Sequence, residues 1–320
     1  VFLSPIRSFY FTPVLSSPVT DALLPHRTAS PPPQTPRTCP RASIPSEPCG
    51  RVKPMVTLSP TGASVPTTLN RFFEKLSSQQ TPALIWYSAN GERIELSGRV
   101  LMNWIDKSAN LLVEECELES GEGFDLQAPL HWRTIVLGLA ALRVGALLDQ
   151  DEPLVAAVCT EQEAGYTNNP AYLLAVDRAP LALSYTGDLQ SLAPHAEEVL
   201  DYCALVRSFG DQYSGLLPDD SVEIIEGFSY AEAYEQALTQ AQAYRTAGYT
   251  LPSGQRALAL ELSPDYGFDA SEATLSALLE VLAILVSGHA VFVADPSVNW
   301  QNGQLASLMV AERAVEISRA

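Results

Sequence analysis

His131 and Trp132 are the two residues of this sequence that are best placed to bind a ligand. They follow a short strand pattern, FDLQAPL, and they open an apolar helix pattern that contains IVLGLAAL. In open α/β sheets, ligands bind beyond the carboxyl ends of the strands, where these two side chains are expected to lie. The sequence therefore predicts a ligand-binding cleft lined by His131 and Trp132. The competing interpretation is structural, with His131 capping the helix and Trp132 packed in the core.

The remaining polar residues form no pattern that is typical of a catalytic or metal site. The motifs HExxH, GxSxG, GxGxxG and CxxC are absent from the sequence. His195 has two glutamates nearby but no second histidine or cysteine at ligand spacing, and His289 directly precedes a predicted strand. We therefore predict no catalytic residue, no metal site and no cofactor. The groups that could still converge on a phosphate are four arginines: Arg133, Arg143, Arg178 and Arg207.

Helix-type and strand-type patterns alternate from residue 69 onward. Apolar residues recur at three- and four-residue spacing in the helices and at every second position in the strands. The predicted helices cover 69–76, 97–116, 131–148, 199–210, 229–248, 269–288 and 305–315. The predicted strands cover 83–87, 93–96, 124–130, 155–160, 172–177, 181–185, 222–227, 257–262 and 291–295. This alternation predicts a layered α/β fold, with mostly parallel sheets flanked by helices and an N-terminal β-hairpin at the Asn90-Gly91 turn.

Capping residues and apolar faces define the starts and the core-facing sides of several of these helices. Ser97 is a candidate N-cap for the helix at 97–116, whose core face we expect to include a buried Trp104. Two capping boxes mark later helix starts: Ser229 with Glu232, and Asp269 with Glu272. The segment 135–142 has no polar residue, which is typical of a helix buried on all sides. Trp300 lies in a polar loop and is expected to contribute little to the core.

Proline and charge divide the chain near residue 54. The first 54 residues hold half of the 24 prolines, with six basic and two acidic residues, whereas the rest of the chain holds 13 basic and 35 acidic residues. We expect residues 1–54 to be a disordered Pro/Ser-rich segment that is not native protein, with Met55 as the true start. A targeting segment is the alternative. Residues 55–320 are expected to form one truncated domain.

The excess of acidic residues limits the class of binding partner, and the cysteines indicate the cellular compartment. A net charge of −18 disfavours nucleic acid and anionic membrane surfaces, because affinity for both depends on Lys and Arg. No apolar run of about 18 residues predicts a membrane span. The cysteines after residue 54 are expected to be buried free thiols, which favours a cytoplasmic protein: Cys116, Cys159 and Cys203.

Three segments together resemble a known family. The helix at 97–116 carries the pattern L-x-x-W-x-x-K-x-A-N-L-L, after the strand pair PALIWYSANGERIELS, and a later helix ends on A-x-R-x-G-A at 141–146. The stretch from SYAEAYEQALTQAQAY to VFVAD follows. In this order the segments resemble the N-terminal domain of the acyl-adenylate-forming (AMP-binding) superfamily. The resemblance covers residues 69–295 and implies that family's layered α/β fold.

The residues that would bind a nucleotide in this superfamily have no counterpart here. The resemblance implies a Ser/Thr/Gly-rich loop ending in Pro-Lys-Gly around the ATP phosphates, and LLPDDSVEIIEGFSY stands in its place, with one glycine, no threonine and no lysine. Glycines let backbone N–H groups cradle phosphate, and acidic side chains repel it. Lys107 is the last lysine, so the family's C-terminal catalytic lysine is not matched, and we expect no C-terminal lid domain before Ala320.

One fragment imitates a family motif. Tyr-Thr-Gly-Asp-Leu at 185–189 matches the family's ribose-binding fragment, but it precedes the position of the nucleotide loop, whereas in the family it follows that loop. A Thr-Gly-Asp sequence is also typical of an ordinary turn. We therefore expect residues 185–189 to form a turn with no role in nucleotide binding.

The resemblance and the missing residues together predict a non-catalytic or cryptic homologue of AMP-binding enzymes. Such a protein would bind a small carboxylate or aromatic molecule, or another protein. A first alternative is an adenylating or acyl-transferring enzyme that is completed by a partner chain. A second is a structural module that forms a homodimer through an exposed apolar face.

Overall fold

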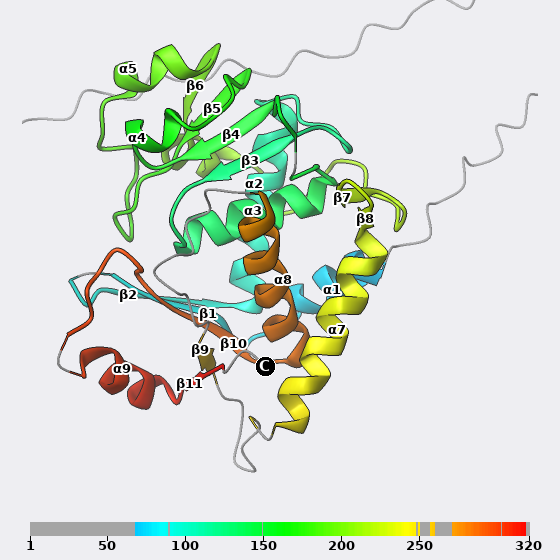
Figure 1. Cartoon of the computed structure of the whole chain (residues 1–320), viewed down its shortest axis with the longest axis vertical. Helices are drawn as coiled ribbons and strands as arrows, with labels where there is room; N and C mark the ends of the chain where they lie inside the picture. Colours follow the sequence, from blue (N-terminus) through cyan, green and yellow to red (C-terminus); the bar gives the residue numbers. More distant parts are fainter. Residues whose placement is uncertain are drawn as a thin grey trace, which may run out of the picture. The chain divides into compact units, whose positions relative to one another are not determined.

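The computed structural model describes residues 68–317, apart from 89, 149, 248, 250–256, 260–270 and 302 (Figure 1). The predictions for residues 1–54 and for the Asp269 capping box lie outside the described residues. No helix among the described residues is long and apolar enough to cross a membrane.

Two sheets carry the fold. The first has four parallel strands in the order β3-β4-β5-β6. Its strands are β3 (Phe124–Gln127), β4 (Val155–Val158), β5 (Tyr172–Ala175) and β6 (Glu198–Asp201). The second has five strands in the order β11-β9-β10-β1-β2, all parallel except the β1–β2 hairpin. Its strands are β1 (Pro82–Tyr87), β2 (Arg93–Ser97), β9 (Ala257–Ala259), β10 (Ala290–Ala294) and β11 (Val315–Glu316). The predicted α/β fold with mostly parallel sheets and an N-terminal hairpin is therefore confirmed.

Helix α3 (Trp132–Val144) lies between the two sheets and contacts both β3 and β1. Its apolar run, 135–142, is buried on every side, as the sequence predicts. The helices α2 (Gly98–Glu114) and α8 (Ser271–Ser287) pack against it, and α7 (Tyr230–Thr246) packs against α8. Together these elements form one large apolar cluster that includes strands of both sheets.

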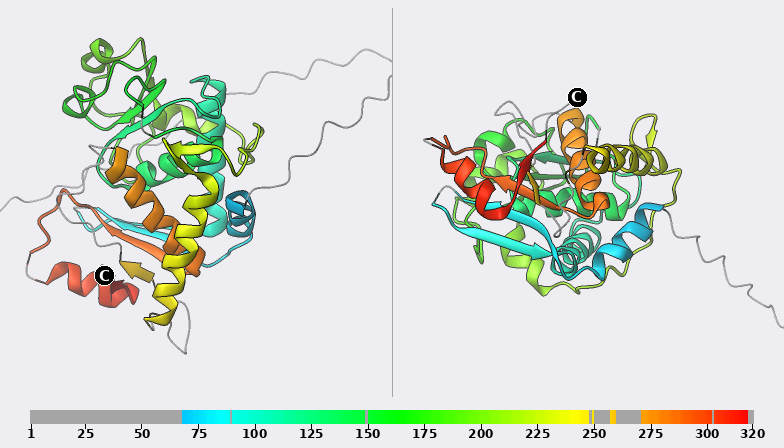
Figure 2. Two further views of the ribbon diagram at one scale, coloured as in Figure 1. Left: turned by 45° about the vertical axis from the view of Figure 1, so that its right-hand side comes forward. Right: turned by 90° about the horizontal axis from the view of Figure 1, so that it is seen from below.

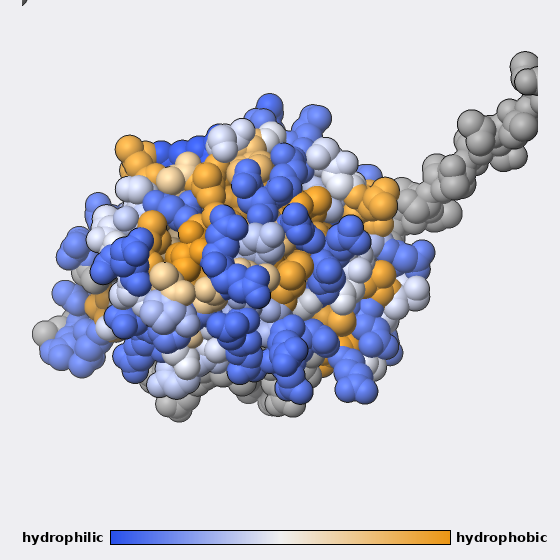
Figure 3. All heavy atoms as spheres, turned by 90° about the horizontal axis from the view of Figure 1, so that it is seen from above, coloured by the Kyte–Doolittle hydropathy of each residue, from blue (hydrophilic) through white to orange (hydrophobic). Residues whose placement is uncertain are grey.

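The remaining elements cover the outer surfaces. Helix α1 (Thr68–Ser77) packs on α2, and α9 (Gln304–Glu312) covers the face of the five-stranded sheet opposite α8, where it meets Ile85, Tyr87 and Phe292 (Figure 2). The short elements are α4 (Glu161–Ala164), α5 (Leu189–Leu192), α6 (Tyr202–Leu205), the 3-10 turns 193–195 and 206–208, and the hairpin β7 (Glu223–Ile225) with β8 (Phe228–Ser229). Seen from above, polar residues separate the apolar ones on the surface (Figure 3).

Local capping signals are confirmed where the structure describes them. The Ser97 hydroxyl accepts a hydrogen bond from the Val100 N–H at 3.3 Å and caps α2. Ser229 and Glu232 form the predicted capping box at the start of α7. Such side chains satisfy N–H groups that would otherwise lack a partner at a helix start. The sequence therefore specifies these helix boundaries locally.

Two predicted elements are wrong. Residues 181–185 form no strand, and Leu181 and Leu183 are 72% and 67% exposed, so their alternation has no sheet to face. Val199 and Leu200 lie in strand β6, not in a helix, because they pair with Leu173 and Leu174 of β5. The helix begins only at Tyr202, after Asp201 accepts a hydrogen bond from the Ala204 N–H at 3.0 Å.

The placement of two tryptophans also differs from the sequence prediction. Trp104 is half-buried and meets Trp132 edge-on, with ring centroids 5.4 Å apart. The fully buried face of α2 consists instead of residues such as Leu101 and Ile105. Trp300 contributes to the core, contrary to the prediction. Its Nε1 donates to the Asp295 carbonyl at 3.0 Å, and its ring packs against the apolar cluster of Ile85, Tyr87 and Phe292 that α9 covers.

Replacing Gly145 should destabilise the fold strongly. Gly145 ends α3 at a φ of +96°, and an added Cβ would lie 2.5 Å from Ser120 Oγ and 2.9 Å from Pro218 Cβ. We expect Gly145→Ala to lower the free energy of unfolding by about 2–4 kcal/mol, from backbone strain plus the clash. Gly91→Ala is the control, since Gly91 has a φ of +76° with nothing within 4 Å. It should lose only about 1–2 kcal/mol in urea unfolding, and equal losses would contradict the role given to the clash.

Glu312 should stabilise the attachment of α9 in a pH-dependent way. Its carboxylate accepts from Arg93 Nε and Nη2 at 2.7 and 3.0 Å and from the Tyr87 hydroxyl. The hydrogen bond from Arg93 lowers the pKa of Glu312, with burial acting in the opposite direction. A lowered carboxyl pKa stabilises the folded state above the unfolded value of about 4.5, and this contribution disappears as the pH falls through the folded value.

We expect Glu312→Gln to cost about 1 kcal/mol near pH 7. The difference from the unmodified protein should shrink as the pH falls from the reference value of 4.5 through the lowered folded-state pKa of Glu312, because the carboxylate becomes protonated over that range. Unfolding by urea at a series of pH values measures this. Glu316→Gln is the matched control, because Glu316 is exposed on β11. A constant difference across the pH range would contradict the assignment to the Glu312 carboxylate.

Candidate functional site

The carboxyl ends of strands from the two sheets meet at one ion pair. Arg178 follows β5 and Asp295 follows β10, and Arg178 Nη2 lies 2.6 Å from Asp295 Oδ1. Arg178 Nη2 also donates to Ser297 Oγ at 2.9 Å. Because the partners come from different sheets, the pair joins the strand ends where ligands commonly bind in this class of fold.

The predicted site residues lie beside this junction but are enclosed. His131 is 1% exposed and Trp132 is 2% exposed. His131 Nδ1 accepts a hydrogen bond from the Arg133 N–H at 3.2 Å, so the imidazole caps α3. Its ring meets Trp86 edge-on at 4.5 Å, and Trp132 packs against Trp104. The structural roles that the sequence suggests are therefore present, and ligand binding by His131 and Trp132 stays a prediction.

His131 is held as a neutral group. Burial lowers its pKa well below the usual value, the positive charges of Arg133 and Arg178 lower it further, and the Arg178 backbone carbonyl acts in the opposite direction. Since Nδ1 accepts, the proton of the neutral ring belongs on Nε2. No protein atom of the described chain forms a hydrogen bond with His131 Nε2 or Trp86 Nε1 at normal distances.

Arg133 organises the loop after β5. Its guanidinium is 2% exposed and donates to three carbonyls: Asp177 at 3.0 Å, Ala179 at 2.7 Å and Ala182 at 3.1 Å. Arg207 Nη2 also reaches the Ala182 carbonyl, at 3.3 Å. Three of the four arginines considered as phosphate ligands thus gather around residues 177–182. Arg133 donates to three carbonyls, Arg178 and Arg207 each bond protein oxygens through Nη2, and the buried Nε of Arg178 has no hydrogen-bond partner among the described residues. The fourth arginine, Arg143, lies at the other end of α3.

The fragment at 185–189 is a turn with protein partners. Asp177 Oδ2 accepts from both the N–H and the hydroxyl of Thr186, at 2.8 and 2.5 Å. The Tyr185 hydroxyl donates to the Cys159 carbonyl at 2.9 Å. Asp188 accepts from the Gln190 N–H at 2.9 Å and caps α5. Tyr185, Thr186 and Asp188 thus all form hydrogen bonds within the protein, and the predicted turn is present. The absence of a role in nucleotide binding stays a prediction.

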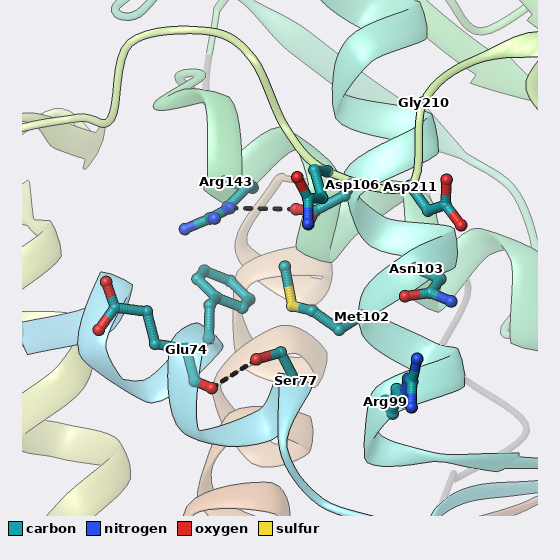
Figure 4. Close-up of a pocket in the computed structure, with 11 residues that line it drawn as sticks. Glu74, Ser77, Arg99, Met102, Asn103, Asp106, Arg143, Gly210 and Asp211 are labelled. Carbon is teal, nitrogen blue, oxygen red and sulfur yellow. Dashed lines mark hydrogen bonds and ion pairs between the residues drawn. The ribbon is translucent and has the colours of Figure 1, made fainter.

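An open groove lies elsewhere, between α1, the first half of α2 and residues 210–212. It encloses about 630 Å³, within the range of small-molecule sites. Figure 4 shows the side chains of α1 and α2 facing each other across it. The lining residues are Phe73, Glu74, Ser77, Arg99, Met102, Asn103, Asp106, Arg143, Gly210, Asp211 and Gln212. Sequence reasoning did not predict this groove.

Asn110 and Lys107 of α2 hold the loop that closes one side of the groove. Asn110 Nδ2 donates to the carbonyls of Gly210 and Gln212 at 3.0 and 2.9 Å, and its Oδ1 accepts from the Ser214 N–H at 3.0 Å. Lys107 Nζ donates to the Phe209 carbonyl. These are the polar members of the K-x-A-N motif. The sequence alone does not link Lys107 and Asn110 to the groove, because their partners lie in a loop about a hundred residues later in the chain.

A buried ion pair forms the inner wall of the groove. Arg143 Nε lies 3.3 Å from Asp106 Oδ1 (Figure 4). Arg143 Nη1 also donates to Asn70 Oδ1 at 3.0 Å. The guanidinium also lies over Phe73, with its carbon 5.3 Å from the ring centroid. Burial raises the pKa of Asp106, while the Arg143 charge and a hydrogen bond from the Tyr213 backbone oppose that shift. The Arg143 guanidinium is therefore engaged by two protein side chains, Asp106 and Asn70.

The described residues contain no group of three or more His, Cys, Asp or Glu side chains that could hold a metal ion. Cys116, Cys159 and Cys203 are all buried free thiols. Burial raises the pKa of Cys116 to about 12, with nearby glutamates adding to the effect. A thiol in that state is a poor nucleophile.

Comparisons with solved structures define the class of fold. An acyl-CoA synthetase from Brucella canis aligns with a TM-score of 0.55 at 13% identity, over 78% of this chain and 47% of the synthetase. The O-succinylbenzoate coenzyme A synthetase from Bacillus subtilis, in complex with ATP and magnesium ion, aligns with a TM-score of 0.51 at 10% identity, over 77% and 62% of the two chains. The chain thus has the fold of the N-terminal domain of acyl-CoA synthetases and related AMP-binding enzymes, and it spans about half the length of the first of these structures.

No family model matches the chain. A TIGR03089 family protein from Mycobacterium tuberculosis (strain ATCC 25618 / H37Rv) is 34% identical over 172 residues, which are 50% of this chain and 69% of that protein. The chain belongs to the TIGR03089 family.

Removing the Asn110 side chain should loosen the loop at 209–214. Asn110→Ala leaves two carbonyls and one N–H without their partner, which should cost about 1–3 kcal/mol in urea unfolding. Hydrogen exchange of residues 210–214 should also speed up. Asn103→Ala is the matched control, because Asn103 lies on the same helix and also lines the groove. Similar protection of the loop in both variants would contradict the assigned role of Asn110.

Proposed function

We propose that this chain is a non-adenylating relative of the AMP-binding enzymes that binds a small carboxylate-bearing molecule. The fold supports descent from a carboxylate-activating scaffold, since the neighbours of known structure are coenzyme A synthetases. The single observation that carries the proposal is the bonding of the buried Arg133 guanidinium, beside the strand ends, to three protein carbonyls. A further argument comes from the chemistry of the segment where the nucleotide loop is expected.

Binding of a triphosphate requires preorganised N–H donors and positive charge to replace its hydration. At the strand ends, Arg133 is bonded to three carbonyls and Arg178 is paired with Asp295. Releasing Arg133 would leave three carbonyls without their partner, which costs several kcal/mol. Releasing Arg178 would break its ion pair with Asp295, whose Oδ1 would keep the hydrogen bonds from the N–H and the hydroxyl of Ser297. Arg133 is therefore poorly suited to hold a phosphate.

The segment between α6 and α7 adds repulsion. Asp219 accepts hydrogen bonds from the N–H and the hydroxyl of Ser221, at 3.0 and 2.8 Å, and these bonds lower the pKa of the Asp219 carboxyl. The turn thus stabilises the negatively charged form of Asp219. Gly227, with a φ of +75°, serves the β7–β8 hairpin. A turn of this kind disfavours an anionic phosphate.

Binding without adenylation is expected to use the groove between α1 and α2. This groove is an accessible cavity lined by both polar and apolar residues, and its volume suits a metabolite-sized ligand. The loop at 209–214 and the Arg143–Asp106 pair fix its walls before any ligand arrives, which reduces the entropy lost on binding.

The purified full chain should show no ATP–pyrophosphate exchange with a broad panel of carboxylic acids. ATP with magnesium should likewise leave the melting temperature unchanged. An active acyl-CoA synthetase assayed in parallel is the positive control, and a reaction without protein sets the background. Exchange clearly above that background, in protein free of contaminating synthetases, would overturn the non-adenylating proposal and favour the enzyme alternative.

A further inference from the structure

The charges on the groove between α1 and α2 do not cancel within the protein. Arg143 and Asp106 pair with each other at the inner wall. Three charged side chains remain around the opening: Arg99 on α2, Glu74 on α1 and Asp211 on the loop (Figure 4). Arg99 and Glu74 are exposed, and neither forms a side-chain ion pair with another described residue.

Asp211 is only loosely engaged. Its carboxylate is 66% exposed and lies 3.9 Å from Lys107 Nζ, which itself donates to the Phe209 carbonyl. A separation of 3.9 Å at an exposed site is worth little. The opening of the groove therefore presents one cation and two acids to a ligand, on elements that come from three separate parts of the chain.

This arrangement discriminates between ligands by charge. A carboxylate without an amine can pair with Arg99 but meets repulsion from Glu74 and Asp211. An amine without a carboxylate meets attraction from the acids but repulsion from Arg99. A molecule that carries both groups can satisfy both signs, and like-charge contacts then work against its singly charged analogues.

The inner surface favours polar recognition over deep apolar insertion. Phe73 and Met102, the apolar members of the lining, are 0% and 2% exposed, so they support the walls more than they contact a ligand. Asn103 is half-buried on the wall and offers both a donor and an acceptor. Charged and hydrogen-bonding groups thus supply most of the contact that a ligand would make.

From these observations we propose that the groove binds a small zwitterion, with its carboxylate on Arg99 and its ammonium group on one of the two acids, Glu74 or Asp211, which lie on opposite sides of the groove (Figure 4). The inference rests on the proposed binding function and specifies its ligand class and site. It concerns the α1–α2 groove, which is separate from the strand ends where the fold's relatives are expected to act on carboxylates.

Isothermal titration of the full chain with four six-carbon compounds tests the proposal. The probes are norleucine, 6-aminohexanoate, hexanoate and hexylamine, of which the first two are zwitterions with different charge spacing. At least one zwitterion should bind about tenfold more tightly than hexanoate and hexylamine. Arg99→Met should weaken that zwitterion about tenfold, whereas Arg71→Met, which removes an exposed arginine of α1 outside the lining, should have no effect.

The double variant Glu74→Gln/Asp211→Asn supplies a readout that a general structural defect would not give. It should weaken the zwitterion and strengthen hexanoate. The zwitterion proposal fails if hexanoate binds the unmodified protein as tightly as the zwitterions, if none of the four binds, or if Arg99→Met changes nothing. None of these results alters the outcome of the exchange assay, so a failure here and a failure of the non-adenylating proposal are distinguishable.

Discussion

The structure depends on the burial of helix α3 between two sheets. A helix in that position can carry charged side chains only near its ends, because an unpaired charge in the middle would be buried in apolar surroundings. Its two charges are Arg133 in the first turn and Arg143 in the last. Arg133 bonds the carbonyls of the loop after β5, and Arg143 pairs with Asp106 beside the groove. Both regions considered as functional sites are therefore organised by the two ends of one helix.

This constraint explains which parts of the fold the sequence predicts correctly. The apolar run of α3, the cap at Ser97 and the hairpin at Asn90-Gly91 are local signals that agree with the surrounding packing. Agreement between local preference and tertiary context is what makes such segments readable without a structure. The cap formed by His131 belongs to the same group, since its position before an apolar helix already suggests it.

The sequence fails where a distant partner decides the conformation. Residues 181–185 alternate like a strand, but Arg133, about fifty residues earlier in the chain, bonds the carbonyls of Asp177, Ala179 and Ala182 and holds this segment in a loop. Val199 and Leu200 fit a helical stripe equally well, and pairing with β5 places them in a strand. Periodicity over a few residues cannot separate these outcomes.

The groove shows the same limit more strongly. Its walls come from α1, α2 and a loop about a hundred residues later, and the residues that join them, such as Lys107 and Asn110, have no distinctive spacing relative to that loop. In the sequence they belong to a motif that resembles a family packing pattern. Only the placement of the loop turns them into supports of a cavity, so a site of this kind is invisible to motif reading.

Strand β2 forms one edge of the five-stranded sheet, beyond β1. A free edge exposes unpaired backbone groups that can recruit a strand from another chain. On β2 the exposed Arg93 and Glu95 alternate with Ile94 and Leu96, and Arg93 is already engaged by Glu312 of α9. An incoming strand would have to dehydrate these charges and displace that contact. The charged residues of β2 thus disfavour pairing of this sheet edge with a strand from another chain.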